Sequence, residues 1–147
     1  MAGFGVLQNN WTTQQLFIGG NLLYKTGTYT NSGGSPVTLA MGTLVGQVLA
    51  TGKILPLVAA ATDGSQYPRG VLQQSYTVAA GASVTVSYCF SGMVNQNMLI
   101  LNGSETLDTT VASATTGGGS IGALITSLTT ITLWASNELS KYDNAVS

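Results

Sequence analysis

The chain has 147 residues, enough for one domain with a buried core. Only 6% of its residues are charged, against about 25% in typical soluble domains. Such a surface is poorly solvated on its own, which favours an obligate oligomer or a subunit of a larger assembly. The alternative is a monomer covered by the hydroxyls and amides of Thr, Ser, Asn and Gln. The four basic residues are scattered, so nucleic-acid binding and a polybasic membrane anchor are not expected.

The first residues, MAGFGVLQNNWTTQQLF, have neither the basic start nor the long apolar core of a signal peptide. Apolar runs elsewhere are interrupted well before the roughly 18 residues that a membrane-spanning helix needs. We therefore expect a soluble protein made in the cytoplasm. The single cysteine, Cys89, agrees with a reducing compartment.

Residues 1–22 differ from the rest of the chain because they carry no charge and no sustained hydrophobic period. This pattern predicts an arm that packs on another surface, followed by a β-rich domain over residues 23–147. The large apolar residues of the arm are Phe4, Val6, Leu7, Trp11, Leu16, Phe17 and Ile18.

Short strand-like runs separated by turn residues follow the arm. We expect strands within residues 22–30, 37–51, 52–60, 71–78 and 84–94, with Gly-, Pro- or Asn-rich turns between them. Residues 62–70, TDGSQYPRG, are expected to form a single connection between two of these strands. In the last run, Val84, Val86, Tyr88 and Phe90 share one face by strand alternation. This spacing predicts a mainly β fold, a small antiparallel sandwich or barrel with one or two short helices.

The last third of the chain contains the helix. Apolar residues recur at helical spacing from Ile121 to Ile131, although the threonines among them lower helix propensity. We expect one short helix, then a strand over residues 130–136 and a loose tail. The Thr- and Gly-rich residues 109–120 before the helix read as a polar loop.

The sequence contains few of the residues that catalysis or metal binding usually requires. The chain has no histidine, which removes Ser-His-Asp catalysis and the commonest transition-metal ligand. Cys89 alternates with apolar neighbours and reads as a packing residue, while Glu105 and Asp108 lie in a polar stretch that we expect to be solvated. Asp63 suits an Asp-Gly turn. We expect no enzyme activity, no cofactor and no metal.

Two weaker patterns point to ligands. Residues 117–122, GGGSIG, match a dinucleotide-binding fingerprint, but no alternation of strands and helices surrounds them, so a flexible loop is favoured. The aromatic residues could form a sugar-stacking platform, although core or interface packing is favoured. A carbohydrate- or receptor-binding β-module is therefore the alternative function. The aromatic residues considered are Trp11, Tyr24, Tyr29, Tyr67, Tyr76, Tyr88 and Trp134.

One stretch resembles a known family. Residues 41–74, MGTLVGQVLATGKILPLVAAATDGSQYPRGVLQQ, place TGK, DGSQ and P-x-G followed by two apolar residues in the order found in the head decoration proteins of tailed phages. The resemblance extends over residues 38–99 and more weakly beyond them. The TTVASATTGGGS loop and the longer apolar arm depart from the family pattern.

The resemblance implies a non-enzymatic structural protein on the outer surface of the virion. With such a source, the alternative binding module would belong to a virion surface or tail. It implies a homotrimer at the three-fold sites of the expanded head, bound to the major capsid protein and resisting the pressure of packaged DNA. The arm is then expected to order on the capsid as an added strand. For contacts between subunits, the candidates are Tyr67, Arg69 and Trp134.

Overall fold

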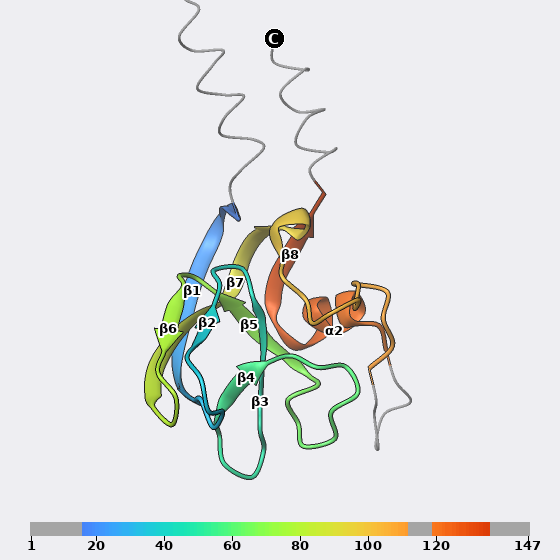
Figure 1. Ribbon diagram of the computed structural model, residues 1–147. Helices are drawn as coiled ribbons and strands as arrows, with labels where there is room; N and C mark the ends of the chain where they lie inside the picture. Colours follow the sequence, from blue (N-terminus) through green and yellow to red (C-terminus); the bar gives the residue numbers. More distant parts are fainter. Residues whose placement is uncertain (1–15, 112–118, 136–147) are drawn as a thin grey trace, which may run out of the picture.

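The computed structural model describes residues 16–111 and 119–135, and this part of the chain is mainly β, as expected. Strands follow one another until a 3-10 turn, η1, after which come one helix and a last strand (Figure 1). The elements are β1 (Phe17–Thr30), β2 (Val37–Leu39), β3 (Leu44–Gln47), β4 (Ile54–Pro56), β5 (Pro68–Leu72), β6 (Tyr76–Val78), β7 (Ser83–Asn95), η1 (Gln96–Met98), α2 (Ile121–Leu128) and β8 (Thr130–Trp134).

Six of the strands form one sheet and two form a separate ribbon. The sheet has the order β1-β7-β5-β3-β4, and β8 joins it by pairing with β7. The ribbon consists of β2 and β6. All these pairs are antiparallel except β7 with β8, which is parallel. The parallel pair departs from the expected antiparallel sheet.

The sheet is buried on both faces at its centre. In β3, Leu44 packs into one hydrophobic core and its neighbour Val45 into another. In β5, Val71 and Leu72 divide between the same two cores. Consecutive strand residues point to opposite faces, so the uninterrupted apolar pairs LV and VL reflect a strand covered on both sides.

A different element covers each face. The helix-side core contains Ile121 and Ile125 of α2 and Ile131 of β8. The ribbon-side core contains Leu39 of β2 and Val78 of β6. The domain therefore has three layers, with the helix, the sheet and the small ribbon stacked in that order.

The sheet also curls toward closure. A Cβ built on Gly27 of β1 would collide with the Ile54 side chain of β4, although these strands stand at opposite ends of the sheet order. Glycine thus lets the two outer strands approach closely. The curling gives the barrel-like character that was expected.

The helix and the strand after it occur where the hydrophobic spacing placed them. Ser120 caps α2, its hydroxyl accepting a hydrogen bond from the Ala123 amide at 3.3 Å. The helix ends at Leu128, before the β-branched residues Thr129 and Thr130. Ile131, which fits the helical spacing, belongs instead to β8.

Residues 62–70, expected as a single connection, are divided between a turn and a strand. Asp63 accepts hydrogen bonds from the Ser65 amide at 3.0 Å and the Ser65 hydroxyl at 2.6 Å, forming the expected turn. Pro68 and Gly70, however, lie within β5, which corrects their assignment to the connection. Gly70 is required there because a Cβ would collide with the Cys89 carbonyl oxygen of β7.

Candidate interaction surface

Both ends of the described chain meet at one end of β7. Val94 of β7 pairs with Phe17 of β1 on one side and Leu133 of β8 on the other. The Asn95 amide donates a hydrogen bond to the Leu16 carbonyl oxygen at 2.8 Å, and Asn95 pairs with Trp134. Residues 1–15 and 136–147 therefore join the domain at the same end of the sheet, the top of Figure 1.

The predicted arm is split by the structure. Leu16 is buried in the helix-side core, and Phe17 packs against the same core. Phe17 and Ile18 begin β1, so the expected boundary after residue 22 falls inside a strand of the sheet. The other arm candidates, Phe4, Val6, Leu7 and Trp11, lie outside the described residues. Capsid binding by any of the seven remains a prediction.

The first half of β1 pairs irregularly with β7. Gly19 pairs with Met93 and Leu23 with Ser91, so residues 20–22 oppose Gly92 alone as a β-bulge. A Cβ on Gly92 would collide with the Leu22 side chain, and Gly92 has a φ of 127°. The close packing of Leu22 over Gly92 therefore depends on glycine at that position.

An exposed apolar patch follows the bulge. Leu23 and Tyr24 are 42% and 44% exposed. The Tyr24 ring meets Phe17 edge to face at 6.5 Å between centroids. The Lys25 ammonium lies 4.6 Å from the centre of the Phe90 ring, a cation–π contact. Edge-to-face rings make a packed corner, not the flat platform that the sugar-binding alternative needs.

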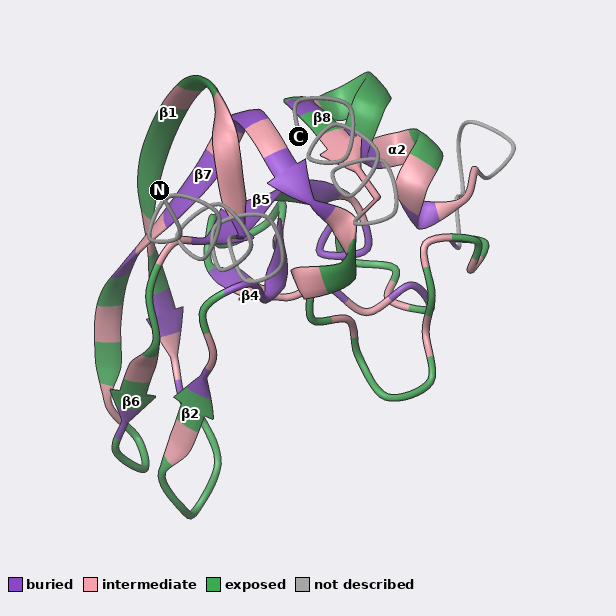
Figure 2. Ribbon diagram, turned by 90° about the horizontal axis from the view of Figure 1, so that it is seen from above, coloured by how far each residue is buried: buried purple, intermediate pink, exposed green. Residues whose placement is uncertain are grey.

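The second half of the β1–β7 pair has a different surface. Thr28 pairs with Thr85 and Thr30 with Ser83, and these side chains are on the face away from the core. The hydroxyls of Thr30 and Ser83 are 2.8 Å apart. Figure 2 shows β1 as exposed or half-buried along most of its length, in contrast to the buried β5. Hydroxyls here replace the charges that usually cover a surface.

The three candidates for contacts between subunits differ in burial and surroundings. Arg69 is exposed on β5 and lies near Tyr88, whose pKa is raised by burial and lowered to a lesser degree by the Arg69 charge. Tyr67 packs against the helix-side core. Trp134 is half-buried at the end of β8. Their role between subunits remains a prediction.

Cys89, the single cysteine, lies in the interior of the domain. Cys89 is fully buried, and burial raises the pKa of its thiol, against weaker opposing hydrogen bonds with the backbone of Ser91 and Leu23. A buried thiol with a raised pKa is a poor nucleophile.

Glu105, expected in a solvated loop, is instead half-buried, and its Oε1 accepts a hydrogen bond from the Ala59 amide at 2.9 Å. This hydrogen bond links the loop after η1 to the loop after β4.

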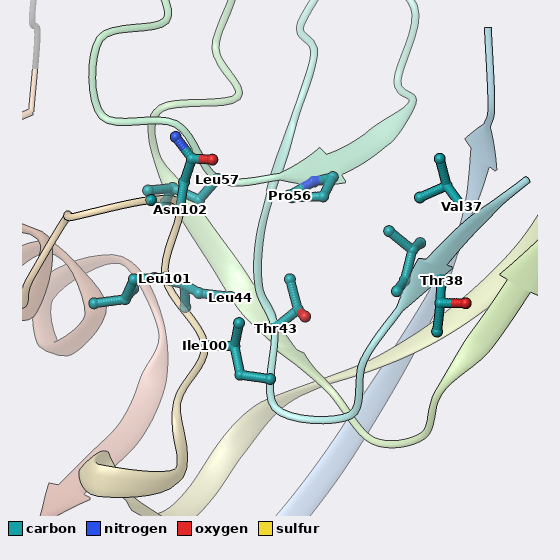
Figure 3. A pocket seen from close by; sticks show the side chains of 11 residues that line it. Val37, Thr38, Thr43, Leu44, Pro56, Leu57, Ile100, Leu101 and Asn102 are labelled. Atoms are coloured by element: carbon teal, nitrogen blue, oxygen red, sulfur yellow. The ribbon is translucent and has the colours of Figure 1, made fainter. Parts of the chain in front are cut away.

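One surface feature was not predicted from the sequence. A groove of 270 Å³ lies between β2, the β3–β4 pair and the segment after η1. In Figure 3, Val37 stands on one side and Leu101 on the other, with Thr43 and Ile100 between them. Its residues come from three separated parts of the chain, so no local motif marks it.

Neither a metal site nor a membrane-spanning helix is found in the described ranges. Within residues 16–111 and 119–135, no three His, Cys, Asp or Glu side chains gather in a way that could hold a metal ion. None of the helices found in these ranges has the length and hydrophobicity to span a membrane.

Comparison with known proteins identifies the family. The family model of bacteriophage lambda head decoration protein D matches residues 6–123, well over half of the chain. No individual curated protein matches. The match begins inside the uncharged N-terminal segment, includes the TGK, DGSQ and P-x-G motifs, and ends within α2. Proteins of this family are structural components of the phage head, not enzymes. The chain therefore belongs to the family of bacteriophage lambda head decoration protein D.

Proposed function

We propose that the protein is a homotrimer that binds the outer surface of the expanded phage head at its three-fold sites. There it bridges neighbouring subunits of the major capsid protein and stabilises the shell against the pressure of packaged DNA. It is made in the cytoplasm of the host and joins the head after expansion. The observation that carries this proposal is the family match over residues 6–123.

The composition supports assembly with a partner. Only nine of the 147 residues are charged, four basic and five acidic, and the first of them is Lys25. The N-terminal segment is thus an uncharged chain that carries several large apolar residues and is attached to the sheet through Leu16 and β1. Extended segments of this kind bind partners by adding a strand, with backbone hydrogen bonds supplying affinity and apolar side chains supplying specificity.

The position of the attachment favours a single capsid-facing end. The N-terminal segment continues from β1 beside the end of β7, next to the exposed patch of Leu23 and Tyr24. A trimer presents three such ends. Once one arm is bound, the others act at high effective concentration, so three weak contacts hold the trimer firmly.

The proposal is tested by mass and by co-sedimentation. The chain in solution is expected to have three times its monomer mass of 15.0 kDa. It is expected to sediment with heads after expansion but not before, and to raise the temperature at which empty expanded heads disrupt. Equal binding to both kinds of head, or binding without stabilisation, would contradict the proposal.

A further inference from the structure

The groove between β2, the β3–β4 pair and residues 100–103 has the chemistry of a binding site for an apolar, uncharged chain. Its lining contains no charged residue, and most of its side chains are aliphatic. Ile100 remains 43% exposed in it, and Met41 nearby is 45% exposed. Exposed apolar surface of this kind is typical of a site that another segment covers.

The N-terminal segment joins the domain close to this groove. A Cβ on Gly42 would lie 3.6 Å from the Leu16 Cδ2 atom, so the Leu16 side chain packs beside Gly42. The Gly42 carbonyl oxygen accepts a hydrogen bond from the Ile100 amide at 2.9 Å, and Thr43 follows Gly42 in the chain. Leu16 is therefore separated by one residue from two residues of the groove, Thr43 and Ile100.

The sequence selects the occupant. Residues 1–15 carry no charge, whereas residues 136–147 contain Glu138, Lys141 and Asp143. Within residues 1–15, Trp11 is the large apolar side chain nearest to Leu16. The five residue steps from Trp11 to Leu16 span at most about 18 Å when extended. A short closed loop costs less entropy than a long one, which favours Trp11 over the apolar residues that precede it.

We propose that the groove binds the Trp11 side chain of the same chain in the free protein. The aliphatic lining covers the indole ring, and the hydroxyl and amide groups at Thr38, Thr43 and Asn102 offer acceptors for its N–H. If residues 1–15 also bind the capsid, as the proposed function requires, the capsid competes with the groove for Trp11.

Trp11 fluorescence tests the docking without phage heads. The spectrum of a Trp11→Phe variant, subtracted from that of the parent chain, removes the contribution of Trp134. The Trp11 emission is expected to be blue-shifted and several-fold less quenched by acrylamide than that of a synthetic peptide of residues 1–15. Trp11 as accessible as in the peptide would overturn the proposal, whatever the result of head binding.

Groove variants locate the site. Ile100→Asp and Val37→Asp are expected to raise quenching of Trp11 to the peptide value while the circular dichroism spectrum stays unchanged. The control is Leu49→Asp on the β3–β4 turn, where Leu49 is 70% exposed outside the groove lining, and its quenching should equal that of the parent. A protected Trp11 that neither groove variant exposes would overturn the assignment.

A mixing experiment distinguishes docking within one chain from docking between copies. Chains with Trp11→Phe keep the groove, and chains with Ile100→Asp keep Trp11. After the two are refolded together, docking within a chain predicts quenching equal to the average of the separate proteins. Recovered protection of Trp11 in the mixture would show that a neighbouring copy supplies it, and would overturn the proposal.

Discussion

The centre of the sheet and the end of β7 use apolar residues in different ways. At the centre, Val71 and Leu72 are fully buried and face two separate cores. At the end of β7, β1 bulges, and Leu23 and Tyr24 remain more than two-fifths exposed. The difference indicates that the centre supplies stability, whereas the end of β7 leaves large apolar side chains partly exposed to solvent.

The largest loss of stability is expected at the centre, from Gly46→Ala. A Cβ on Gly46 would overlap the Ser65 carbonyl oxygen, a backbone atom that no side-chain rotation can move away. We expect a loss of at least about 4 kcal/mol in the free energy of unfolding, measured by urea denaturation. Gly34→Ala is the control, because nothing lies within 4 Å of its Cβ position. Equal stability of the two variants would show that the loop does not pack on β3 as described.

A pair of leucine variants compares the two regions directly. Leu72→Ala should cost about 2–5 kcal/mol because it leaves a cavity in the ribbon-side core. Leu23→Ala should cost less than about 1 kcal/mol, since the side chain is 42% exposed. Thermal and urea unfolding of both proteins measure the difference. Similar losses would mean that the patch after the bulge is structural.

A smaller effect is expected at the bulge. Gly92→Ala places a Cβ against Leu22 at a φ of 127°, which costs about 1–3 kcal/mol. The β1–β7 pairing around residues 19–23 should loosen, and amide hydrogen exchange there should accelerate while that of β5 is unchanged. Unchanged exchange around the bulge would contradict the close packing of Leu22 over Gly92.

The smallest effect is a pH dependence at the turn before β5. Hydrogen bonds from the Ser65 hydroxyl and amide lower the pKa of Asp63 below its ordinary value of 3.8. A folded pKa below the unfolded one gives stability that is present above about pH 4 and lost as the pH falls through the folded pKa. Asp63→Asn should flatten the acid limb of the stability profile slightly, and Ser65→Ala should do so in part. An unchanged acid limb in both variants would show that this turn does not contribute to the loss of stability in acid.

Sequence periodicity predicted the regular elements well. Alternation from Val84 to Phe90 lies within β7, and the apolar spacing from Ile121 gives α2. Pro68 and Gly70 resemble turn residues in the sequence, yet proline is tolerated as the first residue of a strand and β5 begins there. The start of β1 at Phe17 could not be predicted, because Gly19 and Gly20 interrupt the alternation of apolar and polar residues where the strand bulges.

Features built from distant residues could not be predicted in this way. The parallel pairing of β8 with β7 depends on the crossover through α2, which a five-residue strand does not encode. The groove joins Val37, Pro56 and Ile100, which are widely separated in sequence. The burial of Glu105 against Ala59 was missed because its polar neighbours resemble a solvated loop. The family motifs indicated the head decoration family, which periodicity could not do.

The most direct test of the account is head binding by a chain that lacks residues 1–15. The cut preserves Leu16 in the helix-side core and all of β1, whereas removal of residues 1–22 would damage both. We predict that the shortened protein has the circular dichroism and trimer mass of the full chain but no longer sediments with expanded heads. Saturation of the heads by the shortened protein at unchanged affinity would contradict the account.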